Sequence, residues 1–394
     1  MIVAFCHENV DPTRGGCETY IADLAQRMLA DGHEVHLLAR RWNRSRLPDK
    51  IIIHPIQVKY APRWLRPWLF GRGCLRELRQ FTHDVSIGFD KTWGQDVFYP
   101  QGGVYAASQQ SNLEKHALGW RRKCARGLKL FDPAVQSFRL IEQWQYRRAK
   151  VIVVNSAMTQ RHVRQYLGIS EHRVRVVHAA VSQNRFSLTN RNEIRQRIRT
   201  SWGVTDTTAV ALFVAMNYGL KGLSPLLQAL QKVPRDADWK LVVVGSPKFQ
   251  RFLREAIRLG VADRVHFHGF CDDTRQVYFA ADFLVHPTFY DPCSLVVLEA
   301  LACGLPAITT RLNGAAELMN PPWDGLVIDH PRDSDALARA ITDMLDPLRR
   351  RSAAQAAHLS SARWTFEDHY RKMMSILESL QSARQGKVES RAAC

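Results

Sequence analysis

The sequence contains no apolar run of the roughly 18 residues that a membrane-spanning helix needs. It opens on the strand-like stretch Ile2–Phe5, which leaves no room for a signal peptide, so we expect a cytoplasmic protein. Its 8 cysteines form no Cys-x-x-Cys pair and fit neither a zinc ribbon nor a disulfide framework. We therefore expect buried or idle thiols in a reducing compartment, and no metal site.

Two further signatures are missing. Neither half of the chain carries Gly-x-Gly-x-x-Gly after a strand with an acid some 20 residues later, which argues against a nicotinamide-dependent oxidoreductase. No recognised nucleic-acid module is present either, so we expect no nucleic-acid partner despite the basic composition.

The formal net charge is +18, and it is unevenly distributed. Residues 1–190 carry 29 lysines and arginines against 15 acids, whereas residues 191–394 carry 26 against 22. The basic character therefore belongs to the first half, which predicts an anionic partner on that side of the protein.

Strand-like and helix-like stretches alternate along the first half. The strand Ile2–Phe5 leads through a Gly-Gly turn into a helix, and Gly32 ends that helix. Further strands are expected over 35–38, 84–89, 151–155 and 174–178. The polar and basic segment from Ser187 to Trp202 is interpreted as a linker.

A second alternation follows the linker. We expect strands over 209–215, 241–245, 265–268, 283–286 and 307–310, with helices over 224–231, 249–259, 274–280 and 295–302. Such a pattern gives a parallel sheet with helices on both faces, so the fold class is α/β with two doubly wound, Rossmann-like domains. The domains are placed at 1–188 and 189–365, and a C-terminal helix and tail over 366–394 could pack back on the first. Two such domains facing each other would hold a ligand in the cleft between them.

The most informative motif runs from Tyr290 to Ala307. Asp291 and Ser294 suit the start of a helix, and the first-turn amides at Ser294, Leu295 and Val296 would point at a diphosphate or at sugar hydroxyls. Glu299 follows about 1.5 helical turns later. Two carboxylates at this spacing can accept hydrogen bonds from hydroxyls at opposite ends of a nucleotide sugar.

Two other turns offer groups for phosphate. Lys221 follows a strand and a turn that contains Asn217 and Gly219, where its ammonium could neutralise a leaving diphosphate. Gly15 and Gly16, at the first strand-to-helix turn, would let the backbone approach a phosphate closely. Taken alone, either turn is more often only a surface turn.

These motifs together resemble those of family 4 glycosyltransferases. The pair Asp291 and Glu299 is similar to the family's Glu-x7-Glu signature, and the residues from Glu299 to Pro306 match its Glu-Ala-x-Ala-x-Gly-x-Pro tail. The resemblance implies a GT-B fold in which the first acid contacts the transferred sugar and the second contacts the ribose. It also implies that Lys221 and the glycine turn face the donor phosphates. This chain departs from the pattern in having Asp as the first acid, Ser294 where glycine is usual, and no arginine between 214 and 222.

The opening residues Met1–Cys6 and the stretch from Gly88 to Tyr105 are similar to the lipopolysaccharide-core glucosyltransferase branch of that family. Asp90, Lys91 and Asp96 are our candidates for contacts with the acceptor. Members of the branch have His or Asp near positions 101–102, whereas this chain has Gln101 followed by glycine, so no general base is named from that position.

A basic and aromatic stretch over 59–79 suits a membrane interface or an anionic glycolipid. Its candidate membrane-facing residues are Arg63, Trp64, Arg66, Trp68 and Arg72. A second basic cluster lies at Arg121, Arg122, Lys123, Arg126 and Lys129. The simpler interpretation is a solvated basic helix.

The resemblance implies retaining, metal-independent transfer of a hexose, with UDP-glucose as the best donor and no cofactor. The acceptor would be a membrane-associated saccharide such as a lipopolysaccharide core, and the enzyme would be peripheral on the inner face of the cytoplasmic membrane. One alternative stays open, a fold relative without turnover that acts as a basic membrane-docking protein. A glycosidase is disfavoured because a capping Asp and a helical Glu are poorly placed to flank one scissile bond.

Overall fold

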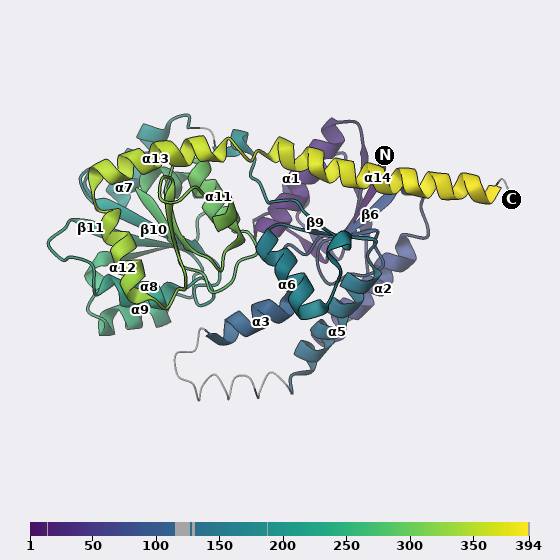
Figure 1. The fold of residues 1–394 in the computed structure, drawn as a ribbon, viewed down its shortest axis with the longest axis horizontal. Coiled ribbons are helices and arrows are strands. Elements are labelled where there is room, and N and C mark those ends of the chain that lie inside the picture. Colours follow the sequence, from purple (N-terminus) through teal and green to yellow (C-terminus); the bar gives the residue numbers. More distant parts are fainter. Residues whose placement is uncertain (14, 115–126, 128–130, 187, 393–394) are drawn as a thin grey trace. The chain divides into compact units, whose positions relative to one another are not determined.

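The computed structural model describes residues 1–13, 15–114, 127, 131–186 and 188–392 (Figure 1). The chain divides into two compact units: unit 1 contains Met1–His178 and Glu367–Cys394, and unit 2 contains Ala179–Phe366. The boundary lies before the expected position at 188, because Ala179, Val181 and Phe186 join the hydrophobic core of unit 2. The second basic cluster, at 121–126 and 129, and Arg14 fall outside the described residues.

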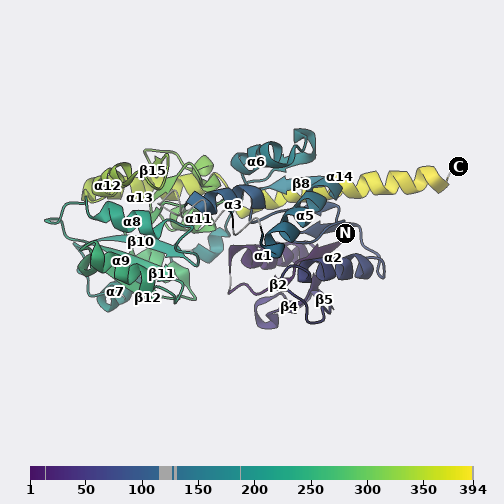
Figure 2. The same cartoon turned by 90° about the horizontal axis from the view of Figure 1, so that it is seen from below.

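Unit 1 is built on a parallel sheet that has seven strands within the described residues, in the order β5-β3-β1-β6-β7-β8-β9. Figure 2 shows β5 and β8 toward opposite edges of this sheet. The strands are β1 Ile2–Cys6, β3 Glu34–Ala39, β5 Ile52–Pro55, β6 Val85–Gly88, β7 Val97–Phe98, β8 Val151–Val154 and β9 Val174–Val176, with a separate short pair β2 Asn9–Val10 and β4 Arg41–Trp42. The helices are α1 Gly16–Ala30, α2 Arg66–Glu77, α3 Tyr105–Glu114, α5 Pro133–Arg148, α6 Ala157–Leu167 and α14 Phe366–Ala392.

The long helix α14 returns from the end of unit 2 and packs on unit 1 (Figure 1). Arg27 of α1 forms two hydrogen bonds of 2.9 Å with the Glu367 carboxylate. The buried His369 imidazole interacts with the Tyr20 hydroxyl at 2.7 Å through Nε2, and its Nδ1 donates to the His178 carbonyl at 2.7 Å. Side-chain contacts in the first turn of α14 therefore hold it to α1 and to the end of the segment that enters unit 2.

Unit 2 is built on a second parallel sheet, with six strands in the described part, in the order β12-β11-β10-β13-β14-β15. The strands are β10 Ala209–Ala215, β11 Trp239–Gly245, β12 Val265–Gly269, β13 Phe283–His286, β14 Ala307–Thr310 and β15 Gly325–Ile328. The helices are α7 Arg191–Ser201, α8 Leu223–Leu230, α9 Gln250–Arg258, α10 Thr274–Ala280, α11 Leu295–Ala302, α12 Ser334–Asp343 and α13 Pro347–Ser361.

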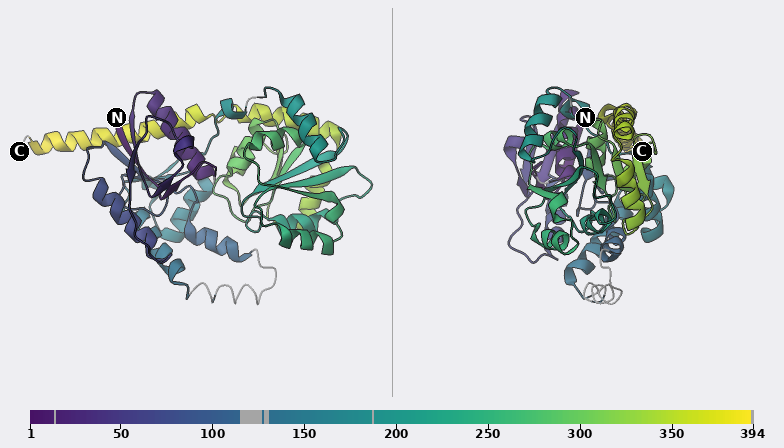
Figure 3. Two further views of the ribbon diagram at one scale, coloured as in Figure 1. Left: turned by 180° about the vertical axis from the view of Figure 1, so that it is seen from behind. Right: turned by 90° about the vertical axis from the view of Figure 1, so that its left-hand side faces the viewer.

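Helices cover both faces of the sheet of unit 2, as Figure 3 shows, and buried residues form a core on each face. Successive side chains of a strand point to opposite faces. Accordingly, Ala211 and Phe213 of β10 join the cluster under α8, α9 and α12. Val210 and Leu212 join the cluster under α10 and α11. Every residue of β10 is buried, and this two-sided burial confirms the predicted doubly wound arrangement.

The predicted linker over 187–202 is wrong, because most of it is the helix α7, packed on α10 of unit 2. Two of its arginines, Arg195 and Arg199, lie on the side that faces α10. Arg195 donates to the carbonyls of Phe279, Ala280 and Ala281 at the end of α10. The guanidinium of Arg199 is buried and bonds Asp282. Arginine side chains here satisfy the carbonyls that a helix end leaves unpaired, a role that composition alone does not reveal.

Strand order places a topological switch point in each unit. In unit 1, successive strands are added toward one edge of the sheet up to β5 and toward the other edge from β6 onward, so the switch lies between β1 and β6. In unit 2 the corresponding switch lies between β10 and β13. Ligands of open α/β sheets bind beyond the carboxyl ends of the strands at such points. The loops after these four strands are therefore where functional residues are expected.

Candidate functional site

In unit 2, the loops after β10 and β13 are joined by backbone contacts. The amide of Phe289 donates to the carbonyl of Leu220 at 2.9 Å. Gly222 has φ +84°, and a Cβ at this position would overlap the carbonyl oxygen of Pro287. Only glycine allows this conformation and this close approach together. The loop that carries Lys221 is thereby fixed against the loop after β13.

Lys221 and Asp291 form an ion pair at this point. The Lys221 ammonium also donates to the Tyr290 carbonyl at 3.4 Å. Burial would raise the pKa of Asp291, but Lys221 and His286 outweigh it and lower this pKa well below its usual range. The carboxylate is therefore ionised at neutral pH, and the predicted cation and first acid lie together.

His286, the last residue of β13, stands behind this ion pair. Its Nε2 lies 3.6 Å from the Asp291 carboxylate and 3.4 Å from the Ser294 hydroxyl. Burial lowers the pKa of His286 and Lys221 acts in the same direction, against the opposing effect of Asp291. The ring is therefore neutral at neutral pH. Sequence reasoning did not select it, although a histidine that ends an apolar strand was a visible signal.

The start of α11 is positioned by Asn313, which sequence reasoning also missed. The Asn313 side-chain oxygen accepts from the amides of Ser294, at 3.1 Å, and Ala315, at 3.0 Å. Ser294 occupies the N-cap but makes no side-chain cap hydrogen bond, contrary to its expected capping role. The first amides of a helix have no partner within the helix, so those of Leu295 and Val296 are suited to an anion.

The second acid, Glu299, is held by a neighbouring helix. Its Oε2 accepts a hydrogen bond of 2.7 Å from the Tyr278 hydroxyl of α10. Burial raises the pKa of Tyr278 well above its usual value, and the Glu299 carboxylate adds to this effect. Tyr278 thus stays a hydroxyl donor that fixes the orientation of a half-buried carboxylate.

The remaining predicted donor contacts lie on two turns. Asn217 is exposed, and its side-chain oxygen accepts from the Leu220 amide at 3.2 Å, so it shapes the turn that precedes Lys221. In unit 1, Gly15 is the N-cap of α1 and Gly16 is its first residue. A Cβ on Gly15 would lie 3.0 Å from the Glu18 carboxylate. A negative side chain therefore already stands at this helix N-terminus.

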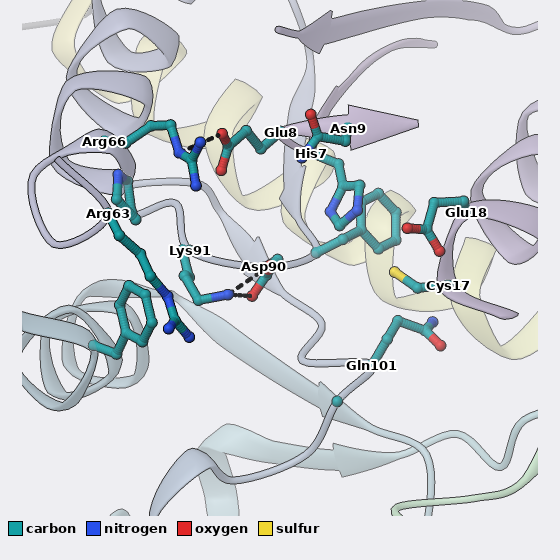
Figure 4. Close-up of a pocket in the computed structure, with 14 residues that line it drawn as sticks. His7, Glu8, Asn9, Cys17, Glu18, Arg63, Arg66, Asp90, Lys91 and Gln101 are labelled. Carbon is teal, nitrogen blue, oxygen red and sulfur yellow. Dashed lines mark hydrogen bonds and ion pairs between the residues drawn. The ribbon is translucent and has the colours of Figure 1, made fainter. Parts of the chain in front are cut away.

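Unit 1 contains a cavity of about 530 Å³ at its own switch point (Figure 4). It is lined by residues that follow β1 and β6, by the start of α1 and by the segment around the start of α2. The charged and polar lining residues labelled in Figure 4 are His7, Glu8, Asn9, Cys17, Glu18, Arg63, Arg66, Asp90, Lys91 and Gln101. Pockets of this volume with convergent polar groups are typical of ligand sites.

The structure brings two predicted acceptor contacts into this cavity and leaves the third outside it. Lys91 pairs with Asp90 at 3.1 Å. Burial would raise the pKa of Asp90, but the effects of Lys91 and His7 outweigh that of burial and lower this pKa. Asp96 instead accepts from the Ser86 amide at 3.0 Å and pairs with Lys150 at 2.6 Å. Asp96 therefore joins β6 to the start of β8, and it does not line the cavity.

The predicted membrane-facing residues divide in a similar way. Arg63 and Arg66 line the cavity, and Arg66 lies 3.4 Å from Glu8. The Trp68 indole donates to the Ser137 hydroxyl at 2.8 Å and packs against neighbouring tryptophans. Trp64 is 43% exposed and Arg72 is exposed. Arg63 is exposed as well, so Arg63, Trp64 and Arg72 remain open surface candidates.

Within the described residues, no three His, Cys, Asp or Glu side chains gather as a metal ion would require. None of the helices in this part of the chain combines the length and the apolar character needed to cross a bilayer.

Two family models match the chain. The glycosyl transferase 4-like domain matches residues 15–180, and the model described as glycosyl transferases group 1 matches residues 208–347. Together they cover more than half of the sequence, and each lies mainly within one unit of the structure.

The chain is also similar to individual proteins along nearly its whole length. It is 26% identical over 365 residues to the lipopolysaccharide glucosyltransferase WaaG of Escherichia coli (strain K12), covering 91% of this chain and 94% of the relative. The crystal structure of WaaG superimposes with a TM-score of 0.80 at 23% identity, covering 95% and 99% of the two chains. Anabaena HepE in complex with UDP-glucose superimposes with a TM-score of 0.73 at 18% identity, covering 96% and 100%.

Proposed function

The chain belongs to the glycosyltransferases that combine a 4-like domain with a group 1 domain, and we propose that it transfers glucose from UDP-glucose to a membrane-associated saccharide such as a lipopolysaccharide core. The observation that carries this proposal is the partly buried ion pair between Lys221 and Asp291 near the start of α11. WaaG is a lipopolysaccharide glucosyltransferase, and HepE has been solved with UDP-glucose. Both names support glucose as the sugar.

The donor diphosphate binds at the N-terminus of α11 in this proposal. The amides of Leu295 and Val296 and the Lys221 ammonium supply positive charge there. When the diphosphate shares the ammonium, Asp291 gains free lone pairs that can accept from a hydroxyl of the glucose. Glu299, oriented by Tyr278, accepts from the ribose hydroxyls.

The transfer step requires charge stabilisation more than proton chemistry in unit 2. As the bond between glucose and diphosphate breaks, negative charge grows on UDP and positive charge on the sugar; the acceptor hydroxyl oxygen bonds the anomeric carbon, and its proton passes to the departing diphosphate. Lys221 and the helix amides stabilise the first, and the ionised Asp291 stabilises the second. The neutral His286 adds no competing charge. We assign a retaining reaction without a metal ion, in which the Lys221 ammonium stabilises the charge that a metal cation would otherwise stabilise.

The acceptor occupies the cavity of unit 1. Its lining supplies carboxylate, amide and guanidinium groups for hydroxyls, and Arg63, Arg66 and Lys91 suit an anionic saccharide. The exposed Trp64 and Arg72 suit a peripheral contact with an anionic membrane surface. The location in this proposal is the inner face of the cytoplasmic membrane.

The test measures UDP release from UDP-glucose in the presence of a lipopolysaccharide core truncated before its outer sugars. Lys221→Ala removes a charge-assisted contact, so we expect UDP to bind at least about tenfold more weakly by calorimetry. Lys232→Ala is the matched control, because Lys232 forms an exposed ion pair with Asp335 at 2.7 Å, and it should bind UDP like the wild type.

Equal UDP affinity in Lys221→Ala and Lys232→Ala would remove the diphosphate assignment. Tight UDP binding without release of UDP from any sugar donor would instead support the alternative of a fold relative that has lost turnover. Binding of the protein to vesicles with and without anionic lipid tests the membrane contact. The proposal predicts binding only to the vesicles that contain anionic lipid.

A further inference from the structure

His7 is the first residue after β1, so it stands at the switch point of unit 1. Its side chain lines the 530 Å³ cavity and is 7% exposed. Nδ1 is buried and finds no hydrogen-bond partner in the part of the chain that the structure describes. Buried polar atoms in proteins are nearly always paired with protein or water, so His7 Nδ1 is available to a water molecule or a ligand in the cavity.

A second lining residue has the same property. The Nε2 amide of Gln101 is also buried without a hydrogen-bond partner among the described residues. The carboxylates nearby are already engaged, since Glu8 bonds Arg40 at 2.8 Å and Asp90 pairs with Lys91. His7 and Gln101 are therefore the neutral lining side chains with an open buried atom, beside the charged Arg66, whose buried Nε also makes no hydrogen bond among the described residues.

The charge state of His7 follows from its surroundings. Burial lowers its pKa, and Lys91 acts in the same direction against the opposing effects of Asp90 and Glu8. The ring is therefore neutral at neutral pH, with one N–H and one lone pair. A neutral imidazole attracts neither a phosphate nor an ammonium group by charge.

We propose that His7 binds the acceptor by forming a hydrogen bond with a hydroxyl of the sugar that receives the glucose. This inference rests on the proposed function. A hydroxyl both donates and accepts. It therefore satisfies the ring in either tautomer, whereas a carboxylate or a phosphate satisfies only one. Figure 4 places the imidazole between Glu8 on one side and Glu18 and Cys17 on the other. A hydroxyl bound to His7 would be surrounded by groups that can bond its neighbours on the sugar ring.

The same arrangement assigns the other groups of the cavity. Arg63, Arg66 and Lys91 take the charged substituents of the acceptor, and His7 takes an uncharged hydroxyl. His7 is a binding residue in this scheme, so its loss should appear mainly in the KM for the acceptor.

The experiment compares His7→Phe with His7→Gln in the full-length protein. Phenylalanine keeps a planar ring and removes both nitrogens, while glutamine restores one donor and one acceptor. With UDP-glucose and the truncated lipopolysaccharide core, we expect His7→Phe to raise the KM for the acceptor about tenfold, the size of one neutral hydrogen bond. His7→Gln should recover part of that loss, and UDP should bind both variants with wild-type affinity.

His162→Phe is the matched control, since it removes an imidazole from α6 that does not line the cavity. It should leave the KM for the acceptor unchanged. If phenylalanine prevents folding, which the melting temperature reports, His7→Leu makes the same comparison. A stable His7 variant without ring nitrogens but with the wild-type KM would overturn the assignment. A wild-type protein that transfers no glucose at all would overturn the proposed function instead.

Discussion

The carboxyl group of Glu142 is buried beneath the start of α3, and this burial raises its pKa to about 7. The side chain, on α5, accepts hydrogen bonds from the backbone amides of Tyr105 and Ala106, the second of them at 3.3 Å. These two amides belong to the first turn of α3. Glu142 therefore anchors a helix end while carrying an ionisable group in a nearly dry place.

The direction of the pH effect follows from comparing the two states. The folded pKa of Glu142 lies above the ordinary value of 4.5, so the folded protein holds this proton more tightly than the unfolded chain. The contribution to stability is complete below pH 4.5 and is lost as the pH rises through about 7. The difference between the two pKa values corresponds to about 3 kcal/mol of unfolding free energy.

Glu142→Gln removes this titration and keeps an oxygen that can accept from the Tyr105 amide. Its NH₂ group then faces the Ala106 amide, which we expect to cost about 1 kcal/mol at every pH. Relative to the wild type, the variant should therefore be about equally stable at pH 5 and more stable by about 2 kcal/mol at pH 8. The free-energy difference should change by about 2.5 kcal/mol between the two.

Urea unfolding at a series of pH values measures this difference, because other titrating groups cancel between the two proteins. Glu171→Gln serves as control, since Glu171 forms an exposed ion pair with Arg164 at 2.9 Å. A difference between the wild type and Glu142→Gln that stays constant from pH 5 to pH 8 would refute the reasoning.

Three further outcomes are expected. Gly222→Ala should lower the unfolding free energy by about 3 kcal/mol in urea, because the site combines φ +84° with overlap of the Pro287 carbonyl; a loss below about 1 kcal/mol would contradict this. Burial lowers the pKa of His369 to about 4. The contribution of the neutral ring to the unfolding free energy is therefore complete above pH 6.5 and is lost as the pH falls from 6.5 toward 4. His369→Gln should flatten that acid dependence by about 3 kcal/mol in a circular-dichroism titration, and an unchanged acid profile would count against it. Arg199→Met removes a buried guanidinium that bonds Asp282 and should cost about 3 kcal/mol by thermal unfolding, whereas an unchanged melting temperature would show that the pair is dispensable.

The strands of unit 2 were readable from the sequence because each is a short, continuous apolar run between turn residues. The predicted strands over 209–215, 283–286 and 307–310 and the predicted helices over 274–280 and 295–302 match the structure residue for residue. The strands β2, β4, β5, β7 and β15 were missed. β7 is two residues long, and β5 lies at the sheet edge with a His-Pro sequence and no buried residue.

The sequence by itself determined the fold class and many of the strands and helices of unit 2, and it selected residues that we expect to bind a sugar nucleotide. It could not determine which loops become neighbours. Lys221 and Asp291 are 70 residues apart, and they meet because β10 pairs with β13. His7 and Asp90 share a cavity because β1 pairs with β6. Strand order is settled by how all the helices and strands of a unit pack together, so no local pattern of residues records it, and only the tertiary structure decided which side chains share a site.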